Sequence, residues 1–305
     1  MGTFILRRFS FVCVVLFGVL TIVFFLQRLS GDPTDLLLPV DASEEIRQEM
    51  RHEMGLDQPL PLQYFRFIGN ALQGNLGESY KFKQPALSLV IERLPNTVLL
   101  ATSALFLALL LSIPLGIIAA VFRNSWIDTT ATGVSLVGQA IPVYWLGLLL
   151  ILLFSVQIRW FPSMGGGSPK ALVLPAVTLA VYSMARIARL TRSAVLDVLN
   201  QEYVMVARSK GLTERVVLFK HVLRNAAIPI ATMVGLQFGG LLGGAVLTEM
   251  VFSWPGIGRL AVQAVYGRDF PVVQAVTLVA AALFSGINLL VDVLYAVLNP
   301  QIRLE

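Results

Sequence analysis

A few ionisable side chains lie within or at the ends of long apolar stretches, and they are the first residues in this sequence that could carry chemistry. Glu249 is five residues before Trp254, and Asp292 lies near the end of the last apolar stretch. Arg186 and Arg189 are three residues apart, so they would share one face of a helix. Charged groups in hydrocarbon are costly and often functional. We therefore treat these residues as site candidates.

Each candidate also has an ordinary structural explanation. Glu249 could pair with Arg259 or cap the turn that follows it. Asp292 is better explained as a packing or salt-bridge residue. Arg186 and Arg189 could extend toward lipid phosphates, the interpretation we favour, or contact the polar loop after them.

Two neutral amides, Gln237 and Asn288, lie within apolar stretches as well. Hydrogen bonding between helices is the default role for such amides. Gln237 begins a small-residue face that continues through Gly239, Gly240 and Gly243. This face would allow either close helix approach or the wall of a lumen, and the sequence leaves both open.

The motifs of common enzymes are absent from the sequence. No Gly-x-x-x-x-Gly-Lys-Ser/Thr phosphate loop occurs, so the chain should not hydrolyse ATP itself. The histidines are His52 and His221, which excludes a His-Glu-x-x-His zinc site, and no Gly-x-Ser-x-Gly occurs. We expect no catalytic residues, no metal site and no cofactor held by this chain. The single cysteine, Cys13, excludes an internal disulfide.

The elements that would position these residues are transmembrane helices. Of 305 residues, 56% are hydrophobic and 13% are charged, with a mean hydropathy of +0.76, whereas soluble domains carry about 25% charged residues. Several apolar runs are long enough to cross a bilayer. We predict an all-α membrane protein with six spans, at residues 9–29, 97–122, 132–157, 172–191, 227–250 and 274–298.

The basic residues indicate the orientation of these spans, since positive charge concentrates in cytoplasmic loops. With the N-terminus inside, the inner segments carry Arg7, Arg8, Arg123, Arg192, Arg208, Lys210, Arg215, Lys220, Arg224 and Arg303. The short outer loops carry Arg159, Lys170, Arg259 and Arg268. We therefore expect both termini in the cytoplasm, and we assign the net charge of +5 to topology and lipid contact, not to nucleic acid.

The polar segment 30–96 is too patterned for a flexible linker. It has a helix start at Asp41 or Ser43, a hinge-like Gly55-to-Pro61 stretch and an aromatic patch around Tyr64. We predict a small, mostly helical periplasmic insert that packs on the bundle.

The loop after the fourth span is the most ordered polar stretch. Apolar residues at 203, 204, 206 and 207 could form one helical face, and Gly211 would end that helix as a C-terminal cap. A second helix would begin at Thr213 and run toward Pro229. Such a basic helix–turn–helix suits either the groove of a partner protein or anionic lipid, and the pattern alone does not separate the two.

The residues of this loop resemble those of a known family. Tyr203-Val204, Ala207-Arg208-Ser209-Lys210-Gly211-Leu212 and His221-Val222-Leu223-Arg224-Asn225-Ala226 are similar to the coupling loop of type I ABC importer permeases, in the dipeptide/oligopeptide branch that includes nickel and glutathione permeases. Met205-Val206-Ala207 stands where the general motif has Glu-Ala-Ala, and Leu223-Arg224 stands where it has Leu-Pro. Ala207 and Gly211 carry over directly.

Further stretches in family order extend the resemblance over nearly the whole chain. They are Leu29-Ser30-Gly31-Asp32-Pro33, Gly55 to Leu60, Gly74 to Ser79, Glu249 to Arg259, Arg268 to Gln274, and Asn288 to Arg303. The implied organisation is a first transmembrane helix (1–29), a periplasmic insert (30–96), a five-helix transmembrane domain (97–298, with its coupling loop at 191–226) and a cytoplasmic tail (299–305).

The resemblance implies a permease subunit that imports peptides across a bacterial inner membrane, or glutathione or nickel chelates by the same machinery. Its partners would be a homologous second permease, two cytoplasmic ATPases that bind ATP and Mg²⁺, and a periplasmic or lipid-anchored binding protein. The implied ATPase-coupling residues are Glu202, Tyr203, Ala207, Arg208, Lys210, Gly211 and Leu212. From their residue types and positions, and not from the resemblance, we predict that the outer gate or pathway residues are Glu249, Trp254, Pro255, Gly256, Gly258, Gln237 and Asn288.

An ion-coupled secondary transporter is the alternative of another class. Such a protein would need several acids at the membrane midplane or paired broken helices. Neither pattern is visible in the sequence.

Overall fold

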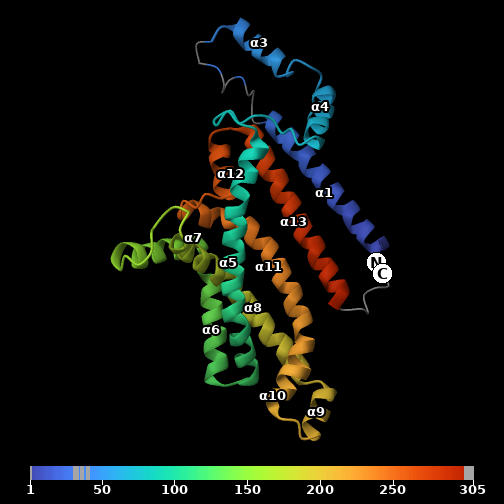
Figure 1. Cartoon of the computed structure of the whole chain (residues 1–305), viewed down its shortest axis with the longest axis vertical. Helices are drawn as coiled ribbons and strands as arrows, with labels where there is room; N and C mark the ends of the chain where they lie inside the picture. Colours follow the sequence, from blue (N-terminus) through green and yellow to red (C-terminus); the bar gives the residue numbers. More distant parts are fainter. Residues whose placement is uncertain (1, 30–33, 35–37, 39–41, 299–305) are drawn as a thin grey trace.

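The computed structural model describes residues 2–29, 34, 38 and 42–298 (Figure 1). Within these ranges the regular structure is helical, and the β pairing is an isolated antiparallel bridge between Glu78 and Pro85. The predicted tail at 299–305 and the Ser30-to-Pro33 motif lie outside the described residues. The all-α prediction is confirmed.

Long helices make up the body of the molecule. They are α1 (Gly2–Leu29), α5 (Ala86–Val121), α8 (Pro169–Leu199), α11 (Leu223–Val251) and α13 (Phe270–Leu298). Helices α1, α5, α8 and α13 each contain a stretch long and apolar enough to cross a membrane, and a further such stretch runs from Glu214 to Gly243 and includes most of α11. Helix α5 begins eleven residues before the predicted start of the second span, because Pro85 starts a helix that runs through Asn96 without a break.

The predicted third span, 132–157, is not one continuous helix. Helix α6 (Trp126–Ala140) ends before Pro142, and α7 (Val143–Leu150) continues into a π-helical segment, Ile151–Gln157. The two halves are bent by 98°, so the described residues contain five helices long and apolar enough to cross a membrane, or six if the bent pair is one span. Ile141 has an extended ψ of 124°, as expected for a residue that precedes proline. Proline therefore breaks the segment that we had predicted as one span.

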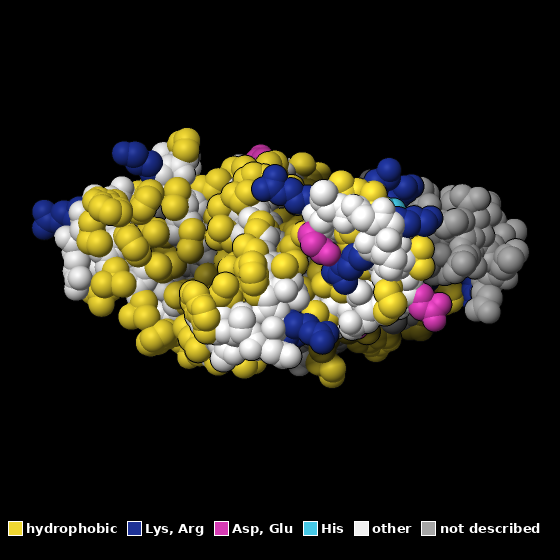
Figure 2. Space-filling model, turned by 90° about the horizontal axis from the view of Figure 1, so that it is seen from below, with side chains coloured by type: hydrophobic (Ala, Val, Ile, Leu, Met, Phe, Trp, Pro, Cys, Tyr) yellow, Lys and Arg dark blue, Asp and Glu magenta, His cyan; other side chains and the backbone are white. Residues whose placement is uncertain are grey.

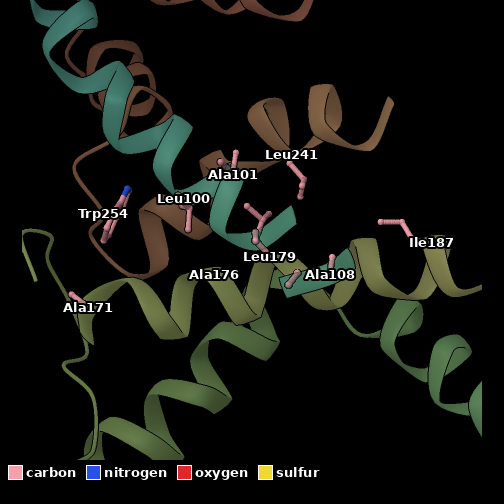
Figure 3. Packing of buried hydrophobic residues seen from close by; sticks show 12 residues of the cluster. Leu100, Ala101, Ala108, Ala171, Ala176, Leu179, Ile187, Leu241 and Trp254 are labelled. Carbon is pink, nitrogen blue, oxygen red and sulfur yellow. The ribbon is translucent and has the colours of Figure 1, made fainter. Parts of the chain in front are cut away.

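The core lies where α5, α8 and α11 meet (Figure 3). Leu100 and Ala101 of α5 pack with Leu179 of α8 and Leu241 of α11, and all four side chains are buried. Small residues bring the helices close together: a Cβ added to Gly116 in α5 would lie 2.6 Å from the carbonyl oxygen of Ala188 in α8. Packing of small residues is the usual basis of association between membrane helices.

The two ends of the bundle carry different short helices (Figure 1). We call them the loop end, which carries the predicted coupling loop, and the insert end, which carries the insert after α1. The loop end carries α9 (Glu202–Ser209) and α10 (Glu214–Val216), together with the connection between α5 and α6. The insert end carries α3 (Glu44–Glu53), α4 (Leu60–Leu72) and α12 (Ile257–Tyr266). Helices α1 and α13 run side by side, and Arg8 and Asp292 form a salt bridge of 3.2 Å between them.

The described part of segment 30–96 is largely helical, as predicted. Ser43 is the N-cap of α3, and its hydroxyl accepts a hydrogen bond from the amide of Ile46. Gly55 has a φ of +65° at the hinge between α3 and α4, a conformation that glycine adopts without strain. Helix α4 packs on α1 through the predicted aromatic patch, where the Tyr64 ring lies 5.3 Å from that of Phe24.

Candidate functional site

Helix α9 is anchored to the loop end of the bundle by two buried side chains. Val204 is completely buried and Ala207 is 7% exposed. They pack in one hydrophobic cluster with Val195 of α8 and with Val217 and Val222 of the following π-helical segment. Because these contacts join α9 to both flanking helices, a displacement of α9 would be transmitted to α8 and α11.

The opposite face of α9 is apolar and exposed. Tyr203, Met205 and Val206 are 42%, 67% and 52% exposed. We had placed 203, 204, 206 and 207 on one face, which is wrong: Val204 and Ala207 face inward, whereas Tyr203 and Val206 face outward. Contiguous exposed apolar side chains on a soluble surface usually mark an interaction site.

A glycine turn follows α9 and is fixed by an ion pair. Gly211 has a φ of +78°, and its amide donates to the carbonyl of Arg208 at 2.9 Å. The guanidinium of Arg208 also donates to both carboxylate oxygens of Glu214, at 2.8 and 3.1 Å. The predicted glycine cap is confirmed, and Glu202, Lys210 and Leu212 are exposed around it.

The second helix of the loop is continuous with α11. Thr213 is the N-cap of α10 with an extended backbone, but its side chain makes no capping hydrogen bond. The helix then passes through the π-helical segment Val217–Val222 into α11, so Pro229 lies inside a helix and does not end one. The amide of Asn225 in α11 donates to the Tyr203 hydroxyl at 2.9 Å. Viewed from the loop end, dark-blue basic groups are more prominent than acidic ones (Figure 2).

At the insert end, Glu249 is completely buried and every contact of its carboxylate is internal. Oε1 accepts from the Thr97 hydroxyl at 2.6 Å, and Oε2 accepts from the backbone amide of Arg259 at 2.9 Å. The same Thr97 oxygen accepts from the amide of Ile257 at 2.9 Å. Glu249 therefore caps α12 at its N-terminus, which is the structural alternative named above. In this conformation the carboxylate is not exposed to any path, and a gate role stays a prediction.

The turn after α11 is fitted closely around this carboxylate. A Cβ on Gly256 would lie 2.1 Å from Glu249 Oε1, and one on Gly258 would lie 3.0 Å from Oε2. Trp254 is buried, and its indole Nε1 donates to the carbonyl of Asn96 at 2.9 Å. The Asn96 amide in turn donates to the carbonyl of Pro255 at 3.1 Å. The structure thus brings together Glu249, Trp254, Pro255, Gly256 and Gly258 against Asn96 and Thr97 of α5.

A second buried carboxylate, Asp269, was missed in the sequence. It is 1% exposed and accepts hydrogen bonds from the Ser79 hydroxyl at 2.5 Å and from the Tyr80 amide at 3.2 Å. Burial, together with the Asp269 carboxylate, raises the pKa of Tyr80 to about 12. Ser79 and Asp269 belong to two stretches that we had quoted separately for the family resemblance. The sequence contained no other indication that Ser79 and Asp269 are in contact.

The remaining candidates lie apart from these sites. Gln237 is 8% exposed, and its Nε2 has no hydrogen-bond partner among the described residues. Asn288 is half-buried on α13. Arg186 contacts the Tyr182 ring 4.6 Å away, and Arg189 donates to Gln139 at 2.7 Å. Neither arginine contacts the coupling loop in a described interaction.

An ion pair at the loop end was also missed. Asp128, at the start of α6, accepts from Arg192 Nε at 2.6 Å and from Arg192 Nη2 at 2.7 Å. We had counted Arg192 only as a topology-determining charge. The pair joins α6 to α8 beside the coupling loop.

Comparison with known proteins decides the family. Residues 112–304 match the family described as binding-protein-dependent transport system inner membrane component, and residues 1–101 match the N-terminal family of the same membrane components. The chain is a member of this family.

Curated relatives of this permease include glutathione transport system permease proteins GsiC. Those of Escherichia coli strain K12 and of Shigella flexneri serotype 5b are each 42% identical over 304 residues, which is 99% of both chains. The chain is therefore a type I ABC importer permease of the peptide/glutathione family and a multi-pass inner membrane protein. A permease of this kind works with a further permease, an ATPase and a substrate-binding protein.

Solved structures confirm the fold of the permease. The inward-facing MetNI methionine ABC transporter matches with a TM-score of 0.61 at 20% identity, over 69% of this chain and 96% of that one. An amino acid ABC transporter with histidines matches with a TM-score of 0.53 at 19% identity, over 68% and 93%. At these identities the likeness concerns the fold alone.

Proposed function

We propose that this permease imports peptides, with glutathione as the first candidate, across the bacterial inner membrane. The curated relatives named above are glutathione permeases, and glutathione is itself a tripeptide. Nickel chelates remain the alternative cargo within the same machinery. Both termini and the loop end face the cytoplasm in this proposal, in accord with the distribution of Lys and Arg.

The proposed assembly contains this chain, a homologous second permease, two ATPases and a periplasmic or lipid-anchored binding protein. The second permease completes the pore, and lipid surrounds both permeases. ATP and Mg²⁺ bind to the ATPases, and this chain holds no cofactor. Glu249, Trp254, Pro255, Gly256 and Gly258 form the outer gate region, and Gln237 and Asn288 lie along the pathway.

The observation that carries the proposal is the two-sided character of α9. Its inward side chains, Val204 and Ala207, are fixed in the cluster that joins α8 to α11. Its outward side chains, among them Met205, present exposed apolar surface flanked by charge. A helix of this kind suits a groove on another protein. Closure of the ATPases on ATP would move residues 197–216 and tilt the bundle from inward-open to outward-open.

Photocrosslinking tests this contact directly. A p-benzoylphenylalanine placed at Met205 should form an adduct with an ATPase subunit when the complex is illuminated in membranes. The same group at Phe17, an exposed residue of α1, serves as the control and should give none. An ATPase adduct from Phe17 but not from Met205 would contradict the proposed docking face.

A transport assay tests the energy source and the cargo. Proteoliposomes that contain the whole complex and the binding protein should accumulate labelled glutathione with ATP and not with a non-hydrolysable analogue. The ion-coupled alternative predicts the reverse, with uptake driven by a proton gradient after ATP is depleted. Competition by dipeptides, glutathione and nickel chelates then ranks the substrates.

A further inference from the structure

Helix α4 carries an apolar stripe that no other described part of the chain covers. Leu62, Phe65 and Leu72 are 51%, 70% and 80% exposed, and their spacing places them along one side of the helix. Arg66 is the one charged residue among the thirteen of α4. Its guanidinium reaches the hinge at Gly55 and not the stripe, since a Cβ on Gly55 would lie 3.0 Å from Arg66 Nη1.

The other side of α4 is fixed to the spanning part of α1. The Tyr64 hydroxyl and the Thr21 hydroxyl are hydrogen-bonded at 2.8 Å. The ring of Phe67 lies 5.6 Å from that of Phe24, which is 2% exposed. Gln63, the buried polar residue of α4, donates to the carbonyls of Leu56 and Gln58 and accepts from Arg28. Its amide is therefore satisfied within the protein.

These contacts give the depth of α4 in the membrane. The uncharged apolar stretch of α1 runs from Phe9 to Leu26, between Arg8 and the polar residues Gln27 and Arg28, and Thr21 precedes Leu26 by five residues. At 1.5 Å per residue this is about 8 Å along the helix axis. The 18 residues of the stretch are about 27 Å long, close to a hydrocarbon core of about 30 Å. The Tyr64 contact thus falls inside the hydrocarbon region of one leaflet.

The side of α1 that meets α4 is partly exposed and apolar. Phe25 of α1 is 51% exposed, and its ring stacks on Tyr64 at 6.3 Å. Helix α3 contrasts with this surface: six of its ten residues, EEIRQEMRHE, are Glu or Arg, and it lies farther from the bundle than α4 (Figure 1). Of the two insert helices, only α4 has the character of an interfacial helix.

We propose that α4 is immersed in the lipid leaflet at the insert end, with Leu62, Phe65 and Leu72 among the acyl chains of phospholipids. The predicted periplasmic insert is then partly a membrane element, with α3 in water and α4 in lipid. The proposal requires only that α1 spans the bilayer, and it is independent of the transported substrate.

Site-directed spin labelling tests the proposal in the complex reconstituted in phospholipid vesicles. With Cys13 replaced by Ser, single cysteines at Leu62, Phe65 and Leu72 carry the nitroxide. The matched control is Ile46, an apolar residue of α3 that is 50% exposed. We expect collisions with lipid-soluble oxygen to exceed those with water-soluble nickel chelate several-fold at the α4 positions, and the reverse at Ile46.

Two outcomes would overturn the proposal. Greater access of the nickel chelate at the α4 positions would place the stripe in water. Low access of both reagents would show that a protein, such as the binding protein or the second permease, covers it. A second measurement uses the unsubstituted chain: a phospholipid with a diazirine on its acyl chain should label peptides from 60–72 and not from 44–53 after illumination.

Discussion

At the scale of single residues, Glu249 shows how a charge can be held within an apolar bundle. Its two oxygens accept from the Thr97 hydroxyl and the Arg259 amide, donors that would otherwise be buried without partners. These contacts link the end of α11, the start of α12 and α5. Glu249 is therefore a structural residue in this conformation, whatever it does during transport.

Substitution of Glu249 separates the capping role from the gate role. Glu249→Ala should lower the thermal stability of the complex in detergent, because each unsatisfied buried donor costs about 1–3 kcal/mol. Glu249→Gln keeps the shape and one acceptor, so capping predicts near-normal stability and transport. A stable Glu249→Gln complex without transport would instead show that the outer gate requires the carboxylate of Glu249.

Gly211 is constrained by its backbone and not by its surroundings. A Cβ at this position would meet nothing within 4 Å, but its φ is +78°. A β-branched residue is strained there, by roughly 1–2 kcal/mol, whereas asparagine tolerates this region. We therefore expect Gly211→Val to lose transport and ATPase coupling with normal membrane insertion, and Gly211→Asn to keep most of both. Equal transport by the two variants would remove the coupling role from this turn.

We expect the pair formed by His52 and Asp57 to make the hinge of the insert sensitive to pH. A hydrogen bond of 2.7 Å raises the pKa of His52 and lowers the pKa of Asp57. The stabilisation is therefore fully present between the ordinary values of about 3.9 and 6.5. It is lost as pH rises through the raised His52 value or falls through the lowered Asp57 value.

Hydrogen exchange measures this effect. Protection factors of the amides at 54–57 should be highest in that window and should fall above it, and His52→Gln should flatten the profile. A wild-type profile with no dependence on pH would show that the pair does not stabilise the hinge.

At the scale of helices, the sequence predicted what depends on local composition and missed what depends on distant contacts. Apolar runs located five spanning helices, and Gly211 located the end of α9. The 98° bend at Pro142 was missed because α6 and α7 together are long and apolar enough to be read as one span. Part of the packing that holds α7 in place comes from α11: a Cβ on Gly147 would lie 3.1 Å from the ring of Phe252, just beyond that helix.

In the candidate site, too, local features were predicted and contacts between distant residues were missed. Residue types and the resemblance indicated the coupling loop, but not which side of α9 faces inward. The partners of Glu249 and Asp269 are 152 and 190 residues away in the sequence. One sequence without aligned homologues contains no direct signal for such pairs.

The connection between α6 and α8 can be tested with a double-mutant cycle. The side chains of Asp128 and Arg192 are 7% and 30% exposed and form two short hydrogen bonds. Asp128→Asn and Arg192→Gln should each destabilise the permease, and the double variant should cost less than their sum. We expect a coupling energy of roughly 0.5–3 kcal/mol, measured by unfolding in mixed micelles. Strict additivity would show that the pair contributes nothing.

At the scale of the whole molecule, movement must pass from the loop end to the core formed by α5, α8 and α11. The hydrophobic cluster under α9 contains residues of α5, α8 and α11, including Ala120, Val195 and Ala226. Close-packed protein interiors transmit displacement with little compression. If an ATPase docks on α9, as proposed, this cluster is the physical link between it and the helices of the core.

Two valines on α9 allow this link to be tested with the same chemical change. Val204 is completely buried and Val206 is 52% exposed, so a threonine hydroxyl is desolvated only at position 204, at a cost of about 1–3 kcal/mol. Val204→Thr should loosen α9 from the bundle and raise the ATP hydrolysed per substrate transported, whereas Val206→Thr should leave thermal stability unchanged and serves as the stability control. The measurement is the ratio of ATPase to transport rates in proteoliposomes. If Val204→Thr keeps the wild-type ratio despite reduced stability, motion does not pass through this cluster, and the docking face of α9 would have to act on the core by another route.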